Sequence, residues 1–176
     1  MTAPPLLPDA RLQRALEVAR VNGRGVLWLC VASAVCAPFL GDWTEAGFAL
    51  VAAASGLMEL HGRRRLLAAD PRGRRWLVGA QAWLLVLIVG YAAWRWLYAT
   101  PEQVWQLLPG FLQRHIDREL LAAGLDPALD RPLLLNLTNK LTSACLVFVG
   151  LVYQGGLAVY YLRLRETPST PAAQRD

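Results

Sequence analysis

Long apolar stretches recur along the chain and are separated by short polar segments, most of which are basic. An unbroken run of apolar or small residues extends from Ala46 to Met58, and three arginines follow it at 63–65. Runs of this kind favour helices that cross a bilayer, because a helix needs about 20 mostly apolar residues to span the hydrocarbon core. The pattern predicts transmembrane helices at 25–40, 43–62, 76–98 and 141–162.

The composition supports the same interpretation. The 176 residues are 55% hydrophobic and have a mean hydropathy of +0.31, which is high for a soluble globular protein of this length. The sequence therefore predicts an all-α integral membrane protein. We expect a single membrane domain over residues 1–176, folded as a four-transmembrane-helix bundle.

Capping signals indicate where the predicted helices begin. Asp42, with Glu45 three residues later, predicts that the second span begins at Trp43. The pair Asp70-Pro71 predicts the end of the second helix and the start of the third. The two helices are therefore expected to be joined by a tight basic hairpin at 63–75.

The segment before the first span, residues 1–23, predicts a short basic amphipathic helix from Ala10 to Val21. Asn22-Gly23 is a typical helix stop, so this helix is expected to be separate from the first span. It lies either on the membrane surface or in solvent. The first span could also be read as a cleaved signal peptide, but its leader is long and the bulky Phe39-Leu40 fits a cleavage site poorly.

The outer segment between the third and fourth spans, residues 99–140, predicts short amphipathic helices and no further crossing. Thr100 and Gln103 have the spacing of a capping box. Pro109-Gly110 separates two apolar patches, and a turn is expected at 130–132. Because these patches are too short to span, we expect their helices to lie on the membrane or to cover one end of the bundle.

Basic residues are distributed unevenly between the two predicted sides. Four arginines precede the first span, the tail 163–176 holds three, and the first outer loop holds none. Six lie in the hairpin: Arg63, Arg64, Arg65, Arg72, Arg74 and Arg75. This bias predicts that both termini and the hairpin are cytoplasmic. The use of arginine almost throughout, with Lys140 the only lysine, indicates a bacterial protein and hence the bacterial inner membrane.

Two kinds of partner are consistent with these features. The basic hairpin either serves only to orient the chain or also binds anionic lipid headgroups or an acidic partner. Small residues along the second span favour close approach of another helix, from a second copy or from a partner membrane subunit. Nucleic acid is not expected, because the arginines flank apolar spans, where topology accounts for them.

Three polar side chains lie inside the predicted spans: Glu59, Gln81 and Gln154. Hydrocarbon penalises such groups, so they are the first candidates for a site. Counted from the hairpin at about 1.5 Å per residue, all three fall in the cytoplasmic half and predict one polar cluster. In one interpretation Glu59 pairs with Arg63 one turn later and Gln81 bonds across the hairpin. In the other, Glu59 belongs to a ligand, proton or ion site.

Groups that could carry enzymatic chemistry are sparse. The only histidines, His61 and His115, are predicted on opposite sides of the membrane, and no phosphate loop, HExxH or GxSxG motif is present. His61 is expected to contact headgroups or water. The cysteines lie in apolar spans without metal spacing and are expected to be small buried residues: Cys30, Cys36 and Cys145. No cofactor and no metal are expected.

Three function classes remain open at this stage. The first is a non-enzymatic scaffold or accessory subunit of a membrane complex. The second is an oligomeric permeation protein for a small solute or ion, with Glu59 lining the path. The third is a membrane enzyme acting on a lipid-linked substrate, for which the sequence offers no nucleophile and base.

Overall fold

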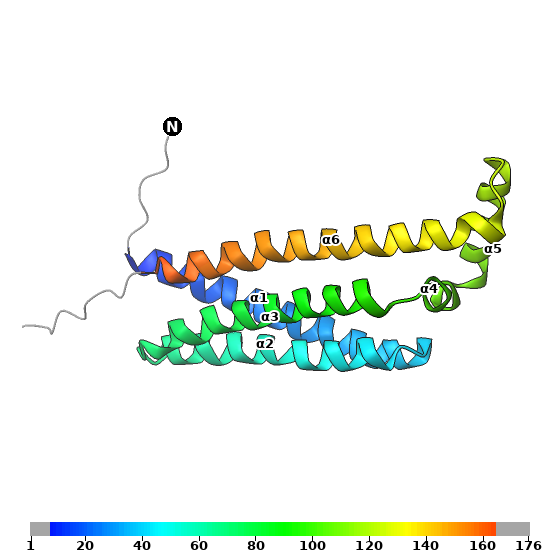
Figure 1. The fold of residues 1–176 in the computed structure, drawn as a ribbon. Helices are drawn as coiled ribbons and strands as arrows, with labels where there is room; N and C mark the ends of the chain where they lie inside the picture. The colour runs from blue at the N-terminus through cyan, green and yellow to red at the C-terminus, as the bar shows by residue number, and fades with distance from the viewer. Residues whose placement is uncertain (1–7, 165–176) are drawn as a thin grey trace, which may run out of the picture.

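The computed structural model describes residues 8–164, and over this range the chain is helical and contains no strand. The elements follow one another as α1 (Pro8–Cys36), η1 (Ala37–Leu40), α2 (Trp43–Leu67), α3 (Arg72–Tyr98), α4 (Pro101–Leu107), α5 (Gly110–Ala122) and α6 (Pro127–Leu162) (Figure 1). The expectation of an all-α fold is confirmed.

In the part of the chain that the structure describes, three helical segments are long and apolar enough to cross a membrane: Ala10–Leu40, Arg72–Tyr98 and Pro127–Leu162. This agrees with the expectation of a membrane protein. α2 is not among the three, so the predicted fourth span is supported only by its place in the fold.

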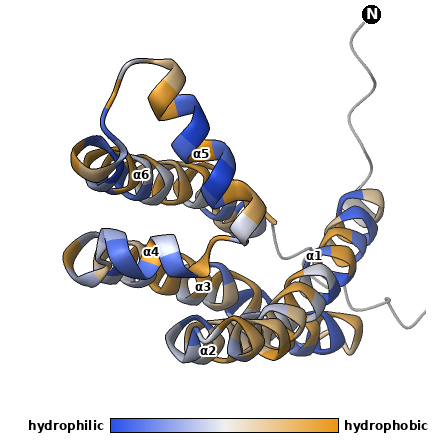
Figure 2. Cartoon of the chain, turned by 90° about the vertical axis from the view of Figure 1, so that its right-hand side faces the viewer, coloured by the Kyte–Doolittle hydropathy of each residue, from blue (hydrophilic) through white to orange (hydrophobic). Residues whose placement is uncertain are grey.

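The long helices pack side by side in the order α1, α2, α3, α6 (Figures 1 and 2). Seen end-on, α6, α3 and α2 lie in a row, and α1 crosses beside α2 (Figure 2). α1 crosses obliquely and reaches α6 at the end of the molecule that carries the α2–α3 turn (Figure 1). There Ala19, Leu77 and Tyr161 form a buried cluster from α1, α3 and α6. We call this the basic end, because it also carries the hairpin arginines.

Glycines bring α2 into close contact with both of its neighbours. A Cβ on Gly56 would lie 2.6 Å from the Gly23 carbonyl oxygen of α1, and a Cβ on Gly73 would lie 2.7 Å from that of Gly62. Real Cβ atoms do not approach oxygens so closely, so only glycine permits this packing. The close helix approach expected along the second span is thus made at Gly56 within the chain itself, by α1.

The caps predicted at Asp42 and Thr100 are present, whereas α3 begins at Arg72, one residue after the predicted Pro71. Asp42 Oδ1 accepts a hydrogen bond from the Glu45 N–H at 2.8 Å, and α2 begins at Trp43 as expected. Thr100 and Gln103 form the reciprocal capping box at the start of α4. The helices expected on either side of Pro109-Gly110 are found as α4 and α5. Whether they lie on the membrane stays a prediction.

Two predicted breaks are wrong. α1 continues through Asn22-Gly23, so the separate N-terminal helix at 10–21 does not exist. A stop signal is a local preference, and here tertiary contacts override it, because both residues pack against α2. α6 begins at Pro127 and runs through the turn expected at 130–132. Pro132 lies near the start of this helix, where it removes a single main-chain hydrogen bond.

Candidate functional site

Glu59 of α2 lies inside the protein with 1% of its surface exposed. Its Oε1 accepts a hydrogen bond from the Tyr161 hydroxyl of α6 at 2.6 Å, and its Oε2 accepts one from the Asn22 amide of α1 at 2.7 Å. A charged or polar group in a low-dielectric interior is tolerated when its partners are in place. Three helices therefore meet at this one carboxyl group.

The contacts extend beyond the carboxyl group. The Tyr153 hydroxyl of α6 donates to Asn22 Oδ1 at 3.0 Å, and this tyrosine is exposed on the side of the molecule. Gln81 of α3 is 2% exposed and makes a weaker contact with the Glu59 carboxyl group. We call Asn22, Glu59, Gln81, Tyr153 and Tyr161 the polar cluster. Each of the four long helices contributes at least one of its members.

The predicted ion pair between Glu59 and Arg63 is wrong. Arg63 Nε donates instead to the Leu16 carbonyl oxygen of α1 at 3.1 Å. Both Glu59 oxygens already have donors from other helices, and the arginine has turned toward α1. The i, i+4 spacing permits a pair within one helix, but contacts between helices decide the partners.

Sequence reasoning found Glu59 and missed three of its neighbours. Asn22 was predicted to be part of a helix stop, and Tyr161 was not among the predicted site residues. A signal for Asn22 does exist: in a continuous helix it shares a face with Ala15 and Ala19, both of which are fully buried. Tyr153 carried no comparable signal.

Gln154 is buried on α6 directly after Tyr153, and in residues 8–164 no hydrogen bond joins its side-chain oxygen to the polar cluster. It lies seven residues before Tyr161 on the same helix face, which places it about 10 Å further along the axis. Among the described residues its Oε1 finds no hydrogen-bond partner, and the same is true there of three other buried oxygens, Gln81 Oε1, Asn139 Oδ1 and Ser143 Oγ. We call these four groups the seam oxygens, because α3 and α6 carry them.

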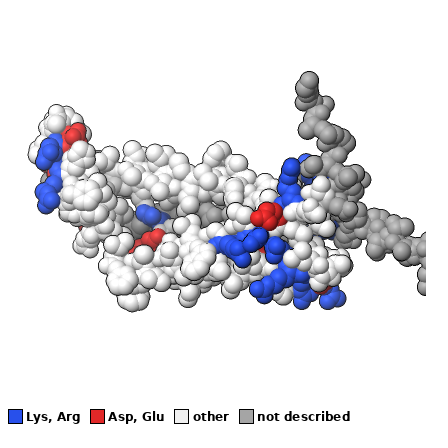
Figure 3. Space-filling model, turned by 180° about the vertical axis from the view of Figure 1, so that it is seen from behind, with Lys and Arg blue, Asp and Glu red and all other residues white. Residues whose placement is uncertain are grey.

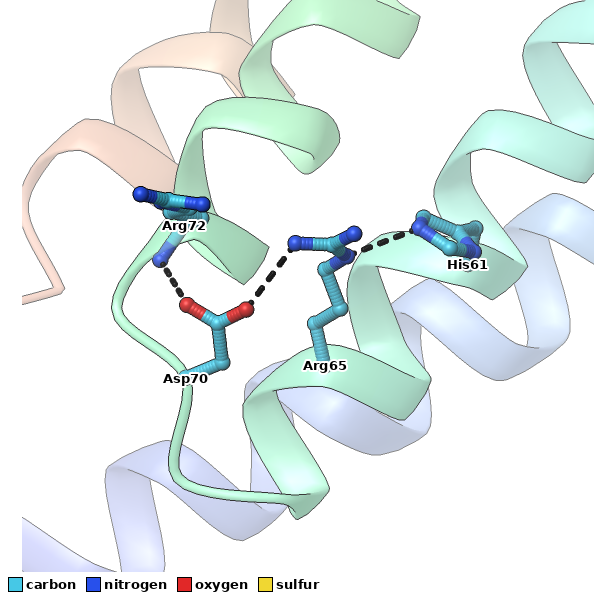
Figure 4. Close-up of polar contacts among 4 residues, drawn as sticks. All are labelled: His61, Arg65, Asp70 and Arg72. Carbon is cyan, nitrogen blue, oxygen red and sulfur yellow. Dashed lines mark hydrogen bonds and ion pairs between the residues drawn. The ribbon is translucent and has the colours of Figure 1, made fainter.

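The hairpin contains an exposed network around Asp70 (Figure 4). Arg65 donates to Asp70 at 3.0 Å and to His61 Nε2 at 2.8 Å, and the Arg72 N–H donates to Asp70 Oδ1 at 2.9 Å. The Arg72 main-chain N–H, together with the Arg65 guanidinium, holds the pKa of Asp70 below its usual value. His61 also lies edge-on to the Trp76 ring at 4.8 Å. His61 is nevertheless exposed, so its expected contact with headgroups or water stays a prediction.

The six hairpin arginines divide into two groups. Arg63 binds the Leu16 carbonyl, Arg74 binds the Leu164 carbonyl at 3.1 Å, and Arg65 binds Asp70, so these three hold helix ends together. The other three have exposed side chains with no ion pair among the residues that the structure describes: Arg64, Arg72 and Arg75. Basic side chains gather visibly at this end (Figure 3).

Neither metal-ligand clusters nor disulfides occur in residues 8–164. The expectation that all three cysteines are buried is wrong: Cys30 is half-buried, whereas Cys36 and Cys145 are exposed on the outside of the helices. The surface around Cys145 is apolar, so an exposed thiol here faces the region that lipid would occupy.

Comparison with protein-family models, curated proteins and solved structures finds no match for this chain. Its function is therefore argued from the geometry of the polar cluster, the hairpin and the helix surfaces.

Proposed function

We propose that this protein is a non-enzymatic multi-pass membrane protein that serves as a scaffold or accessory subunit of a membrane complex. The observation that carries this proposal is the closure of Glu59. A carboxyl group with 1% of its surface exposed and a donor on each oxygen joins helices and leaves no room for a substrate. Glu59, the most polar side chain inside the helices, thus serves to hold the helices together.

The proposed topology has four crossings with both termini in the cytoplasm of a bacterium. The fold supports the fourth crossing because α1 ends and α3 begins at opposite ends of the molecule (Figure 1). α2 connects them, and its 25 residues extend about 37 Å at the rise of an α-helix. This length exceeds the roughly 30 Å of a hydrocarbon core.

The exposed arginines of the hairpin extend the proposal to the membrane surface. The side chains of Arg64, Arg72 and Arg75 are exposed and make no ion pair within the described part of the chain. Each basic side chain close to an anionic leaflet contributes about 1 kcal/mol of attraction. We propose that these three bind anionic headgroups on the cytoplasmic face, while the other hairpin arginines hold the helices.

Cross-linking in native membranes tests the scaffold proposal. A membrane-permeable bis-maleimide should join Cys145 to a neighbouring membrane protein, either a second copy or another subunit, which mass spectrometry then identifies. Cys145→Ser should abolish the product and Cys36→Ser should leave it. If no product forms, and the protein is a single monodisperse protomer in several detergents, the proposal is wrong.

The second candidate, a permeation protein, is favoured by the seam oxygens. Buried polar atoms without a protein partner are commonly satisfied by water, and these four belong to α3 and α6, which pack against each other. Flux of protons or small ions into proteoliposomes would support this candidate if Glu59→Gln reduced it. Flux that is absent, or unchanged by the substitution, removes it. The third candidate, an enzyme on a lipid-linked substrate, has no geometric support in residues 8–164.

A further inference from the structure

Two shallow grooves on the side of the molecule meet at Tyr153. The first has a volume of about 390 Å³, lies between α1 and α6, and is lined by Arg14, Glu17, Val18, Val21, Asn22 and Tyr153. The second has a volume of about 480 Å³, continues along α6, and is lined by Phe148, Val149, Val152, Tyr153, Gly156 and Leu157. We call the two together the α1–α6 groove.

The groove is charged at one end and apolar at the other. Arg14 and Glu17 are exposed, and they lie beside Leu16, whose carbonyl binds Arg63 of the hairpin. The charged end is therefore level with the basic end of the molecule, where headgroups meet the protein. The far end, around Val149 and Val152, offers only apolar side chains.

The length of the apolar part matches one leaflet of a bilayer. From Leu157 to Phe148 the groove follows nine residues of α6, or about 13 Å. Half of a hydrocarbon core is about 15 Å. An acyl chain lying in this part would therefore end near the middle of the membrane when its headgroup is at Arg14.

We propose that the α1–α6 groove binds one phospholipid with an ethanolamine headgroup. Arg14 has no ion pair in residues 8–164 and lies where the phosphate would be. Glu17 lies one turn away and supplies a carboxylate for the primary ammonium, since its pairing with Arg20 is loose at 3.8 Å. One acidic and one basic side chain fit a zwitterionic headgroup better than an anionic one.

The glycine at position 156 leaves space for the acyl chain. A Cβ added to Gly156 meets no atom within 4 Å, and the same holds for its neighbour Gly155, which does not line the groove. A larger side chain at either position can therefore be accommodated without disturbing helix packing. Only the one at position 156 would fill the groove.

Native mass spectrometry of the detergent-solubilised full chain, after incubation with equal amounts of phosphatidylethanolamine, phosphatidylcholine and phosphatidylglycerol, tests the proposal. The protein should retain one phosphatidylethanolamine. Arg14→Gln and Gly156→Leu should each lower this retention about fivefold, which corresponds to about 1 kcal/mol of binding free energy. Arg11→Gln and Gly155→Leu, the matched controls, should leave it unchanged. Glu17→Gln should abolish the preference for phosphatidylethanolamine over phosphatidylcholine.

Two results would overturn the proposal. One is equal retention of phosphatidylethanolamine by Gly156→Leu and Gly155→Leu, which would mean that lipid coats the helices without a defined site. The other is a Gly156-dependent lipid that is phosphatidylglycerol, which would mean that the groove selects negative charge. Phosphatidylglycerol bound by the hairpin arginines can be distinguished from both results. Gly156→Leu fills the groove and would not release lipid that is bound at the hairpin.

Discussion

At the scale of single residues, the polar cluster shows how one buried group depends on partners far away in the sequence. The sequence indicated that Glu59 is a candidate site residue, since hydrocarbon penalises any carboxyl group. It did not predict Asn22 and Tyr161 as its donors, because they are 37 and 102 residues away and no local pattern encodes such distances. Arg63, the neighbour favoured by spacing, binds another helix.

Tyr161→Phe should lower stability, because it removes the donor to Glu59 Oε1 and leaves a buried acceptor unpaired. Hydrogen bonds between membrane helices contribute about 0.6 to 1.7 kcal/mol. For a chain of this size that loss corresponds to a melting temperature lower by about 2 to 6 °C. Thermal unfolding in mild detergent measures it. Tyr160→Phe removes a hydroxyl that makes no hydrogen bond in the described structure, and an equal effect of both substitutions would contradict the role of Tyr161.

The hairpin residue Asp70 predicts that the stability of the protein depends on pH. Its pKa is lowered in the folded protein, first by the Arg72 N–H, so its contribution to stability is present above the unfolded pKa of about 3.9 and is lost as pH falls through the folded pKa. Melting temperatures should therefore decrease below about pH 4, and part of that decrease should vanish in Asp70→Asn. An identical acid decrease in the variant would show that other carboxyl groups cause it.

At the scale of elements, the sequence predicted the start of α2 and the two short outer helices from their caps and turns. The prediction of helix breaks failed within α1 and α6, which continue through residues that usually break helices. Asn22 and Gly23 each make a contact with α2 that needs a helix at that point. Local signals were outweighed by packing, and packing between distant helices cannot be read from one segment.

Gly56→Ala should loosen the contact between α1 and α2. Its new Cβ would lie 2.6 Å from the Gly23 carbonyl oxygen, which is main chain and cannot move without shifting a helix. Overpacking of this kind costs about 1 to 3 kcal/mol. The matched control is Gly47→Ala in the same helix, where the Cβ meets open space and should be neutral or stabilising. Equal melting temperatures of the two variants would contradict the close packing.

At the scale of the whole molecule, the helices form a row in which α6 packs mainly against α3. Its ties to α2 and α1 are side-chain hydrogen bonds, in which Tyr161 reaches Glu59 of α2 near the basic end and Tyr153 reaches Asn22 of α1. This arrangement leaves the long apolar sides of α6 exposed, as a protein surrounded by lipid or partner helices requires.

The proposed orientation can be measured with single cysteines in a background lacking the native three. Ala69→Cys, in the exposed turn between α2 and α3, should react with a membrane-impermeant maleimide only after cells are opened. Cys36, restored alone at the other end of α1, should react in intact spheroplasts. Reaction of both from the same side would contradict an odd number of crossings between them.

The separation of Glu59 from Tyr161 has a consequence for how the chain is made. The carboxyl group is synthesised 102 residues before its second donor. At ordinary rates of translation, about 5 to 20 residues per second, that interval is about 5 to 20 s. During it Asn22 is the one of the two donors that already exists, so Glu59 Oε1 lacks its hydrogen bond until α6 supplies Tyr161.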